Sequence, residues 1–205
     1  MDLEAPLKPE VLRPLITLVV PGTIAIGPFV LITGHYVPAV ERFWTQHATA
    51  FSVLVALAIL ATGFVIDDFG THIEVEWWDP QISSNHPDHD TNWNRYLKLQ
   101  LKDELIAQRY LRLKLTQMKF ELAMAIALPI SWTGLLWLNC IFRFWFGTTM
   151  GFITIGFVTA TTLLLRESLI TARLLSRTRA LILNAIDDGV KGISGPASTS
   201  DPVSQ

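Results

Sequence analysis

Histidine and carboxylate side chains gather in one polar segment of the sequence, between residues 67 and 90. Asp68, His72 and Glu76 are spaced four residues apart, and His86 and His89 follow in a run rich in Ser, Asn, Pro and Asp. Carboxylates and imidazoles are side chains that bind zinc, manganese and iron. A bound divalent transition metal would generate hydroxide from water, which is the chemistry of a hydrolase or transferase. These five residues are therefore the candidate metal ligands.

The spacing alone leaves the geometry of this cluster open. In a helix, Asp68, His72 and Glu76 would share one face, whereas in a strand His72, Glu74 and Glu76 would do so. No spacing in the segment matches a zincin motif or a related metal-binding motif. The alternative interpretation is structural: Asp68 ends the preceding apolar stretch, and residues 83–90 form a solvated loop. We favour this structural interpretation, and we expect no cofactor other than such a metal.

Other common catalytic patterns are absent from the sequence. It contains no Gly-x-Ser-x-Gly nucleophile motif, no phosphate-binding loop and no dinucleotide fingerprint. Cys140 is the only cysteine, so it forms no disulfide within the chain and no zinc site of its own. The 16 Lys and Arg residues do not outnumber the 18 Asp and Glu residues, which argues against nucleic acid as a partner. We therefore assign no catalytic residue and favour a protein that is not an enzyme.

The elements that must carry these residues are membrane spans. Hydrophobic residues make up 50% of the 205 residues and charged residues only 17%, against about 25% charged residues in soluble domains. Four stretches contain no charged residue, and each has about the 20 residues that a helix needs to cross the hydrocarbon core. They are Leu15–Gly34, Ala48–Ile66, Leu122–Phe142 and Phe144–Leu165. Because backbone groups in lipid must bond within their own segment, we predict an all-α polytopic membrane protein with four transmembrane helices.

The distribution of Lys and Arg predicts the orientation of these spans. The two connections on one side contain only Arg42 and Arg143, whereas every other Lys and Arg lies on the opposite side. Segments rich in Lys and Arg stay in the cytoplasm, so both termini are expected there. The aromatic residues Tyr36, Trp44 and Trp145 flank the outer ends, where aromatic belts form. This asymmetry suits the inner (plasma) membrane of a bacterium.

Five segments follow from this topology. Residues 1–66 hold the N-terminal leader and the first transmembrane hairpin. Residues 67–119 form a cytoplasmic segment, in which the acidic and histidine-rich loop precedes an amphipathic helix. Residues 120–166 form the second hairpin, residues 167–188 a C-terminal cytoplasmic helix, and residues 189–205 a disordered tail rich in Gly, Ser and Pro.

The two cytoplasmic helices are predicted from hydrophobic spacing. Trp93 to Lys119 contains no Gly or Pro, and its leucines recur near helical spacing, although two short strands are the alternative. In the second helix, leucines and isoleucines line one side; they are Leu174, Leu175, Leu181, Ile182 and Ile186. This helix would lie on the inner leaflet or, as we favour, extend span four and pack on the first helix.

Two features of the second hairpin indicate how it packs. Glu121 and Arg166 stand at the inner ends of spans three and four, where they would form an interfacial ion pair. Gly147, Gly151 and Gly156 lie in span four, and small residues let helix backbones approach closely, within one chain or between copies. These glycines are the candidate packing or oligomerisation face. No charged residue lies deep within a span, which argues against an ion-coupled transporter.

We predict a non-catalytic, multi-span inner-membrane protein, a scaffold or effector that self-assembles and couples the membrane to a cytoplasmic partner. The protein partner would bind residues 93–119 and 166–188, and the other partners are membrane lipids and further copies of the chain. A pore-forming effector in stress or defence is one specific form of this function. The alternative is a metal-dependent hydrolase or transferase at the membrane interface that uses the cluster between Asp67 and Asp90.

Overall fold

The protein is a bundle of long helices. The computed structural model describes residues 9–85, 91 and 106–193, with side chains described at residues 15–84, 91 and 109–184. In chain order the elements are α1 (Pro9–Tyr36), α2 (Pro38–Gln46), α3 (Ala48–Ile73), the π-helical turn η1 (Glu74–Trp78), α4 (Asp79–Asn85), α6 (Ile106–Phe142) and α7 (Gly147–Ile193). The described residues contain four helices that are long and apolar enough to cross a membrane. The predicted all-α polytopic membrane fold is therefore confirmed.

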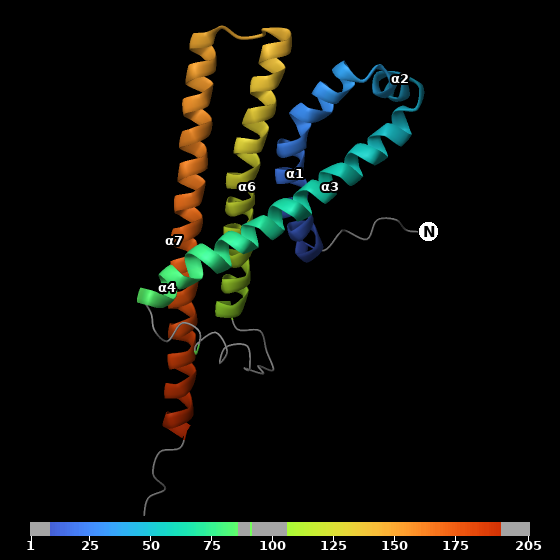
Figure 1. Cartoon of the computed structure of the whole chain (residues 1–205). Coiled ribbons are helices and arrows are strands. Elements are labelled where there is room, and N and C mark those ends of the chain that lie inside the picture. The colour runs from blue at the N-terminus through green and yellow to red at the C-terminus, as the bar shows by residue number, and fades with distance from the viewer. Residues whose placement is uncertain (1–8, 86–90, 92–105, 194–205) are drawn as a thin grey trace, which may run out of the picture.

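The bundle has two different ends (Figure 1). Helices α6 and α7 form an antiparallel pair, α1 lies against α6, and α3 crosses α1 and α6 at a steep angle. At the hairpin end, α2 joins α1 to α3, and residues 143–146 join α6 to α7. At the extended end, η1, α4 and the charged parts of α6 and α7 continue beyond the uncharged stretches. At 1.5 Å per residue, α7 reaches about 40 Å past Leu165.

The turn between α6 and α7 is tight because one residue adopts a left-handed conformation. Arg143 has a φ of 53°, and its N–H donates to the Asn139 carbonyl at 2.8 Å. The Asn139 side-chain oxygen then accepts the Trp145 N–H at 2.9 Å. Left-handed residues of this kind commonly end a helix and satisfy its last carbonyls. The two longest helices of the described chain are therefore held as a close antiparallel hairpin.

Two glycines bring the backbones of α1 and α3 together where they cross. A Cβ added at Gly22 would overlap the carbonyl oxygen of Ile59, and one added at Gly63 would overlap the carbonyl oxygen of Leu18. In lipid, helices associate through such van der Waals contact, because burial of apolar surface gives little driving force there. The crossing of α1 and α3 thus depends on the absence of side chains at both positions.

The contact between α1 and α6 also depends on a glycine. A Cβ added at Gly134 on α6 would come within 2.7 Å of the Pro28 side chain on α1. Helix α1 bends in its outer half (Figure 1), where Pro28 lacks the N–H that would bond to the Ile24 carbonyl. This bend carries the start of α2 away from α6.

The larger of the two described core clusters lies at the extended end. There Trp78 of η1 and Ile82 of α4 pack in one cluster with side chains of α6 and α7. The side chains buried with them are Leu111, Met118, Leu122, Ala172, Leu175 and Ile182. The expected packing of the C-terminal helix on the helix before span three is thus confirmed over the described residues. The core joins η1 and α4 to α6 and α7 at the extended end.

The turn η1 shifts the register of the helix that carries Trp78. The Asp79 N–H donates to the Glu74 carbonyl five residues earlier, so this turn contains one residue more than an α-helical turn. In an uninterrupted α-helix, the buried face that contains Gly70 would continue two turns later at Trp77. The wider turn instead brings Trp78 into the core, 7% exposed, and leaves Trp77 72% exposed.

Several boundaries differ from those predicted. The segment expected to be an acidic and histidine-rich loop is helical as far as Asn85, because its polar residues occupy the outer side of a helix whose other side is buried. Helix α7 continues to Ile193, past the predicted start of the tail, and the outer connection contains the additional helix α2. Of the predicted amphipathic helix, Ile106 onward is continuous with span three. Residues 93–105 of that helix and 194–205 of the tail lie outside the described residues.

Candidate functional site

Asp68, His72 and Glu76 lie on the outer side of α3 and η1, as the helical interpretation predicts. All three are exposed, and His72 Nε2 lies 3.2 Å from Glu76 Oε2. This contact is an ion pair when the imidazole is protonated. Three apolar side chains are exposed on the same side of the helix: Phe69, Val75 and Trp77. We term these six residues the acidic face.

The described part of this cluster does not form a metal cage. Within the described residues, no three His, Cys, Asp or Glu side chains converge closely enough to hold an ion. Asp68, His72 and Glu76 face solvent, whereas a bound metal needs ligands that surround it. His86 and His89 lie outside the described residues. The divalent-metal site therefore stays a prediction.

Glu74 is the carboxylate of η1 that faces the neighbouring helices. It lies beyond Ile66, where the uncharged stretch of α3 ends, and it is half-buried. Burial raises the pKa of the Glu74 carboxyl, and Asp79 raises it further, whereas Lys119 on α6 and Arg179 on α7 lower it. The turn η1 thus directs one carboxylate inward to these two cations and another, that of Glu76, outward.

Glu121 stands near the same junction on α6. Its Oε1 atom accepts a hydrogen bond from Gln117 Nε2 at 2.7 Å, and its Oε2 atom is buried with no hydrogen-bond partner. Arg166 on α7 is exposed, and no ion pair joins it to Glu121 in the part of the chain that the structure describes. The geometry therefore gives the predicted interfacial pair no support.

The glycines of α7 do not share one face. Gly147 and Gly151 are four residues apart and lie on one side, whereas Gly156 lies roughly 140° around the helix from Gly151. Gly156 opens onto a groove of about 340 Å³ between α6 and α7, lined also by Leu128 and Phe157. An added Cβ at any of the three glycines would meet no described atom within 4 Å. All three positions leave room for another helix or for lipid.

The part of α7 beyond its uncharged stretch exposes a second surface that the sequence pattern did not resolve. Leu175 and Ile182 are buried, but their neighbours Leu174 and Leu181 are 41% and 61% exposed. Ile170, 45% exposed, continues this line toward the membrane. Three exposed arginines lie along it at helical spacing: Arg166, Arg173 and Arg177. We term Arg166, Ile170, Arg173, Leu174, Arg177 and Leu181 the basic face.

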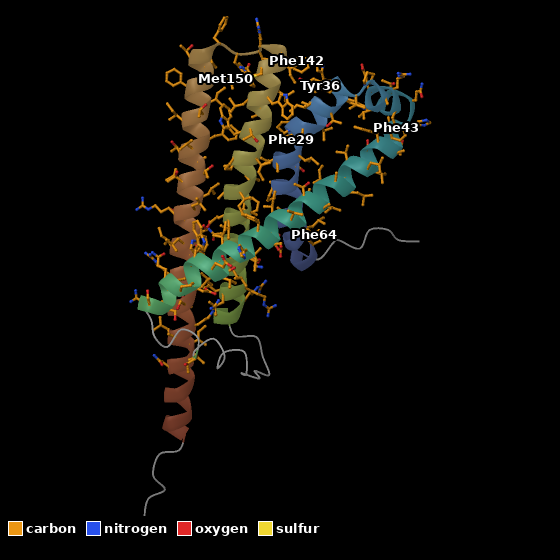
Figure 2. The ribbon with its side chains drawn as sticks, viewed as in Figure 1. Phe29, Tyr36, Phe43, Phe64, Phe142 and Met150 are labelled. Carbon is orange, nitrogen blue, oxygen red and sulfur yellow. The ribbon has the colours of Figure 1, made fainter. Side chains whose placement is uncertain are left out.

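The hairpin end contains an aromatic cavity of about 380 Å³, lined by His35, Glu41, Trp44, Phe142 and Phe144 among others. The His35 ring lies 4.9 Å from the Phe142 ring, edge to face. Figure 2 shows Phe142 near this end of α6 and Tyr36 near the same end of α1. Aromatic rings at such a level match the belt that forms at membrane–water interfaces.

The described geometry provides surfaces rather than a reaction centre. No known protein-family model, curated protein or solved structure matches the chain, so its function has to be inferred from these surfaces.

Proposed function

We propose that this protein is a non-catalytic scaffold of a bacterial inner membrane that self-assembles through α7 and couples the membrane to a cytoplasmic partner. The observation that carries this proposal is the exposure of α7. Only 6% of its most apolar stretch is buried against the rest of the chain, and the same helix continues about 40 Å past Leu165. A helix exposed on most of its surface, in the membrane and beyond it, offers contact area to further chains.

The core at the extended end supports the coupling part of the proposal. Trp78 and Ile82 fasten α3 to both α6 and α7 at that end. Because packed cores resist continuous deformation, a change in the position of the spans on assembly would move the extended end as one unit. A partner bound at this end would therefore sense the assembly state of the spans.

Photocrosslinking in native membranes tests the self-assembly, because a photoreactive side chain reacts with whichever surface of a neighbouring copy lies against it. The photoreactive residue replaces Ile155, which is 64% exposed on α7, or Met150, which is 8% exposed on the same helix. We expect irradiation to produce crosslinked copies from the Ile155 position and not from the Met150 position. A chain that stays monomeric in nanodiscs and gives no crosslink at any exposed α7 position refutes the proposal.

The pore-forming version of this function has its own test. Vesicles that contain the protein and a trapped dye should leak in proportion to the assembled fraction if the assembly encloses a pore. Assembly without leakage supports a scaffold that forms no pore.

The orientation is tested in a Cys140→Ser background with an impermeant thiol reagent, which should label Arg42→Cys from outside the cell and Arg177→Cys only after permeabilisation.

We retain a metal-dependent hydrolase or transferase as a second proposal, supported by the 3.2 Å contact between His72 and Glu76. Elemental analysis of purified protein should then find about one transition metal per chain. The triple variant His72→Ala, His86→Ala, His89→Ala should lose this metal. The matched control is His35→Ala, His47→Ala, which removes the two histidines of the hairpin end. No metal above background in the wild type eliminates this proposal.

A further inference from the structure

We infer that copies of this protein assemble head to tail, with the acidic face of one copy bound to the basic face of the next. This inference rests on the proposed self-assembly and specifies its contact. The two faces lie on different elements, α3 with η1 and α7, and both are exposed in the single chain. Each combines charged side chains of one sign with large apolar ones, which is the composition of a surface that another chain covers.

Lipid does not account for Leu174 and Leu181 of the basic face. The uncharged stretch of α7 ends at Leu165, and Leu181 lies about 24 Å further along the helix. That distance carries Leu181 past the headgroup region, which adds only about 5–8 Å to each side of the hydrocarbon core. Leu174 and Leu181 are nevertheless 41% and 61% exposed. Their cover has to come from protein.

The charges of the two faces are complementary. Arg166, Arg173 and Arg177 are exposed, and none of them forms an ion pair with another described residue. On the acidic face, Asp68 and Glu76 are exposed carboxylates. Opposite charges across an interface favour the correct pairing and disfavour the contact of like faces. A second copy supplies the required acidic surface and is present at the same place in the membrane.

The two faces also lie at the same depth. Trp78, beside the acidic face, packs in one core with Leu175 and Ile182. These residues are the immediate neighbours of Leu174 and Leu181 on the basic face. Copies related by an axis along the membrane normal keep their depth, so the acidic face of one copy meets the basic face of another at one level.

Symmetry selects the head-to-tail arrangement. A two-fold axis along the membrane normal that ran through either face would place that face against itself, with Arg173 opposite Arg173 or Glu76 near Glu76. Like charges so placed repel. A heterologous contact pairs unlike faces instead, and it closes into a ring when the rotation between copies divides a full turn. In the expected assembly each copy therefore uses both faces, one toward each neighbour.

Charge reversal on each face provides the test. The basic-face variant is Arg173→Glu, Arg177→Glu, and the acidic-face variant is Asp68→Lys, Glu76→Lys. Each variant alone places like charges in the contact, so its assembly in nanodiscs should weaken by about 100-fold. An equimolar mixture restores opposite charges at every contact and should assemble again. The chain with all four substitutions should assemble with itself for the same reason.

The control and the outcomes separate this inference from the proposed function. Arg42→Glu, Arg109→Glu changes the net charge as the basic-face variant does, but at exposed arginines outside both faces; it should assemble like the wild type. If both face variants assemble normally, the inference is overturned while self-assembly stands. If each face variant is monomeric and neither the mixture nor the quadruple variant restores assembly, the inference is also overturned. A monomeric wild type overturns the proposed function itself.

Discussion

Replacing Trp78 with alanine tests whether η1 sets the packing of the extended end. Trp78 is 7% exposed and packs in the core formed by η1, α4, α6 and α7. Removing a buried aromatic side chain costs about 3–5 kcal/mol, from lost transfer energy and from the cavity left behind. Trp77 is 72% exposed, and Trp77→Ala should change stability by about 0.5 kcal/mol or less. Trp77 and Trp78 have the same side chain and differ in burial, so Trp77→Ala is the matched control for Trp78→Ala.

Hydrogen–deuterium exchange of the protein in nanodiscs measures the difference. Because about 1.4 kcal/mol corresponds to a factor of ten, backbone amides of residues 70–82 should exchange roughly 100- to 4,000-fold faster in Trp78→Ala. In Trp77→Ala they should change by about twofold or less. Peptides around the crossing of α1 and α3 should be unaffected by either variant. An equal acceleration in both variants, or a larger one in Trp77→Ala, refutes the register shift.

Three further changes test other joints of the fold. Gly63→Ala should lower the unfolding temperature, measured by circular dichroism, because the added Cβ overlaps the α1 backbone. The control is Gly27→Ala, whose Cβ meets nothing described within 4 Å and which should raise stability by up to about 1 kcal/mol. Deleting Val75 should convert η1 into an α-helical turn and keep the tryptophan buried, because Trp78 then follows Gly70 by seven residues; limited proteolysis of the extended end should therefore be no faster than in the wild type. Burial raises the pKa of Glu74, so the folded chain holds this proton more tightly than the unfolded chain, and stability should fall as pH rises through the raised value. Denaturant midpoints of the wild type and Glu74→Gln should therefore coincide in acid, and the variant should be the more stable at neutral pH.

The number and positions of the spans were predictable because they depend on composition alone. Uncharged stretches such as Leu122–Phe142 are long enough to cross a membrane whichever way their side chains point. Hydrophobic spacing and the absence of Gly and Pro predicted that helix continues beyond the uncharged stretches, as it does from Ile106 to Lys119 and from 167 to 188. Composition could not predict η1, because one extra residue in a helical turn leaves no pattern of residue types.

The inward side of each helix was predictable only in part. Leu174 is adjacent to Leu175 and Leu181 to Ile182, so hydrophobicity alone allowed either member of each pair to be buried. The packing of η1 determines which member is buried, since Trp78 forms one core with Leu175 and Ile182. The exposed members of both pairs then become visible as a surface that needs a partner.

The direction of each side chain in the acidic segment was also not predictable from residue types. Glu74 and Glu76 are two residues apart and looked like members of one acidic cluster, but η1 directs the first toward Lys119 and Arg179 and leaves the second exposed. The inner carboxylate is therefore partly desolvated within the extended end, whereas the outer one lies at the exposed surface, 3.2 Å from His72.

The two proposals place competing demands on the basic face. The cytoplasmic partner was predicted to bind residues 166–188, and the head-to-tail contact uses Arg166 to Leu181 of the same helix. A partner that covers this face therefore occupies the place of the neighbouring copy. Because linkage between two binding events is reciprocal, such a partner would weaken assembly by the same factor by which assembly weakens its binding. Coupling between the membrane and the cytoplasm then requires no conformational change along the helices, because the partner and the neighbouring copy exclude each other from α7.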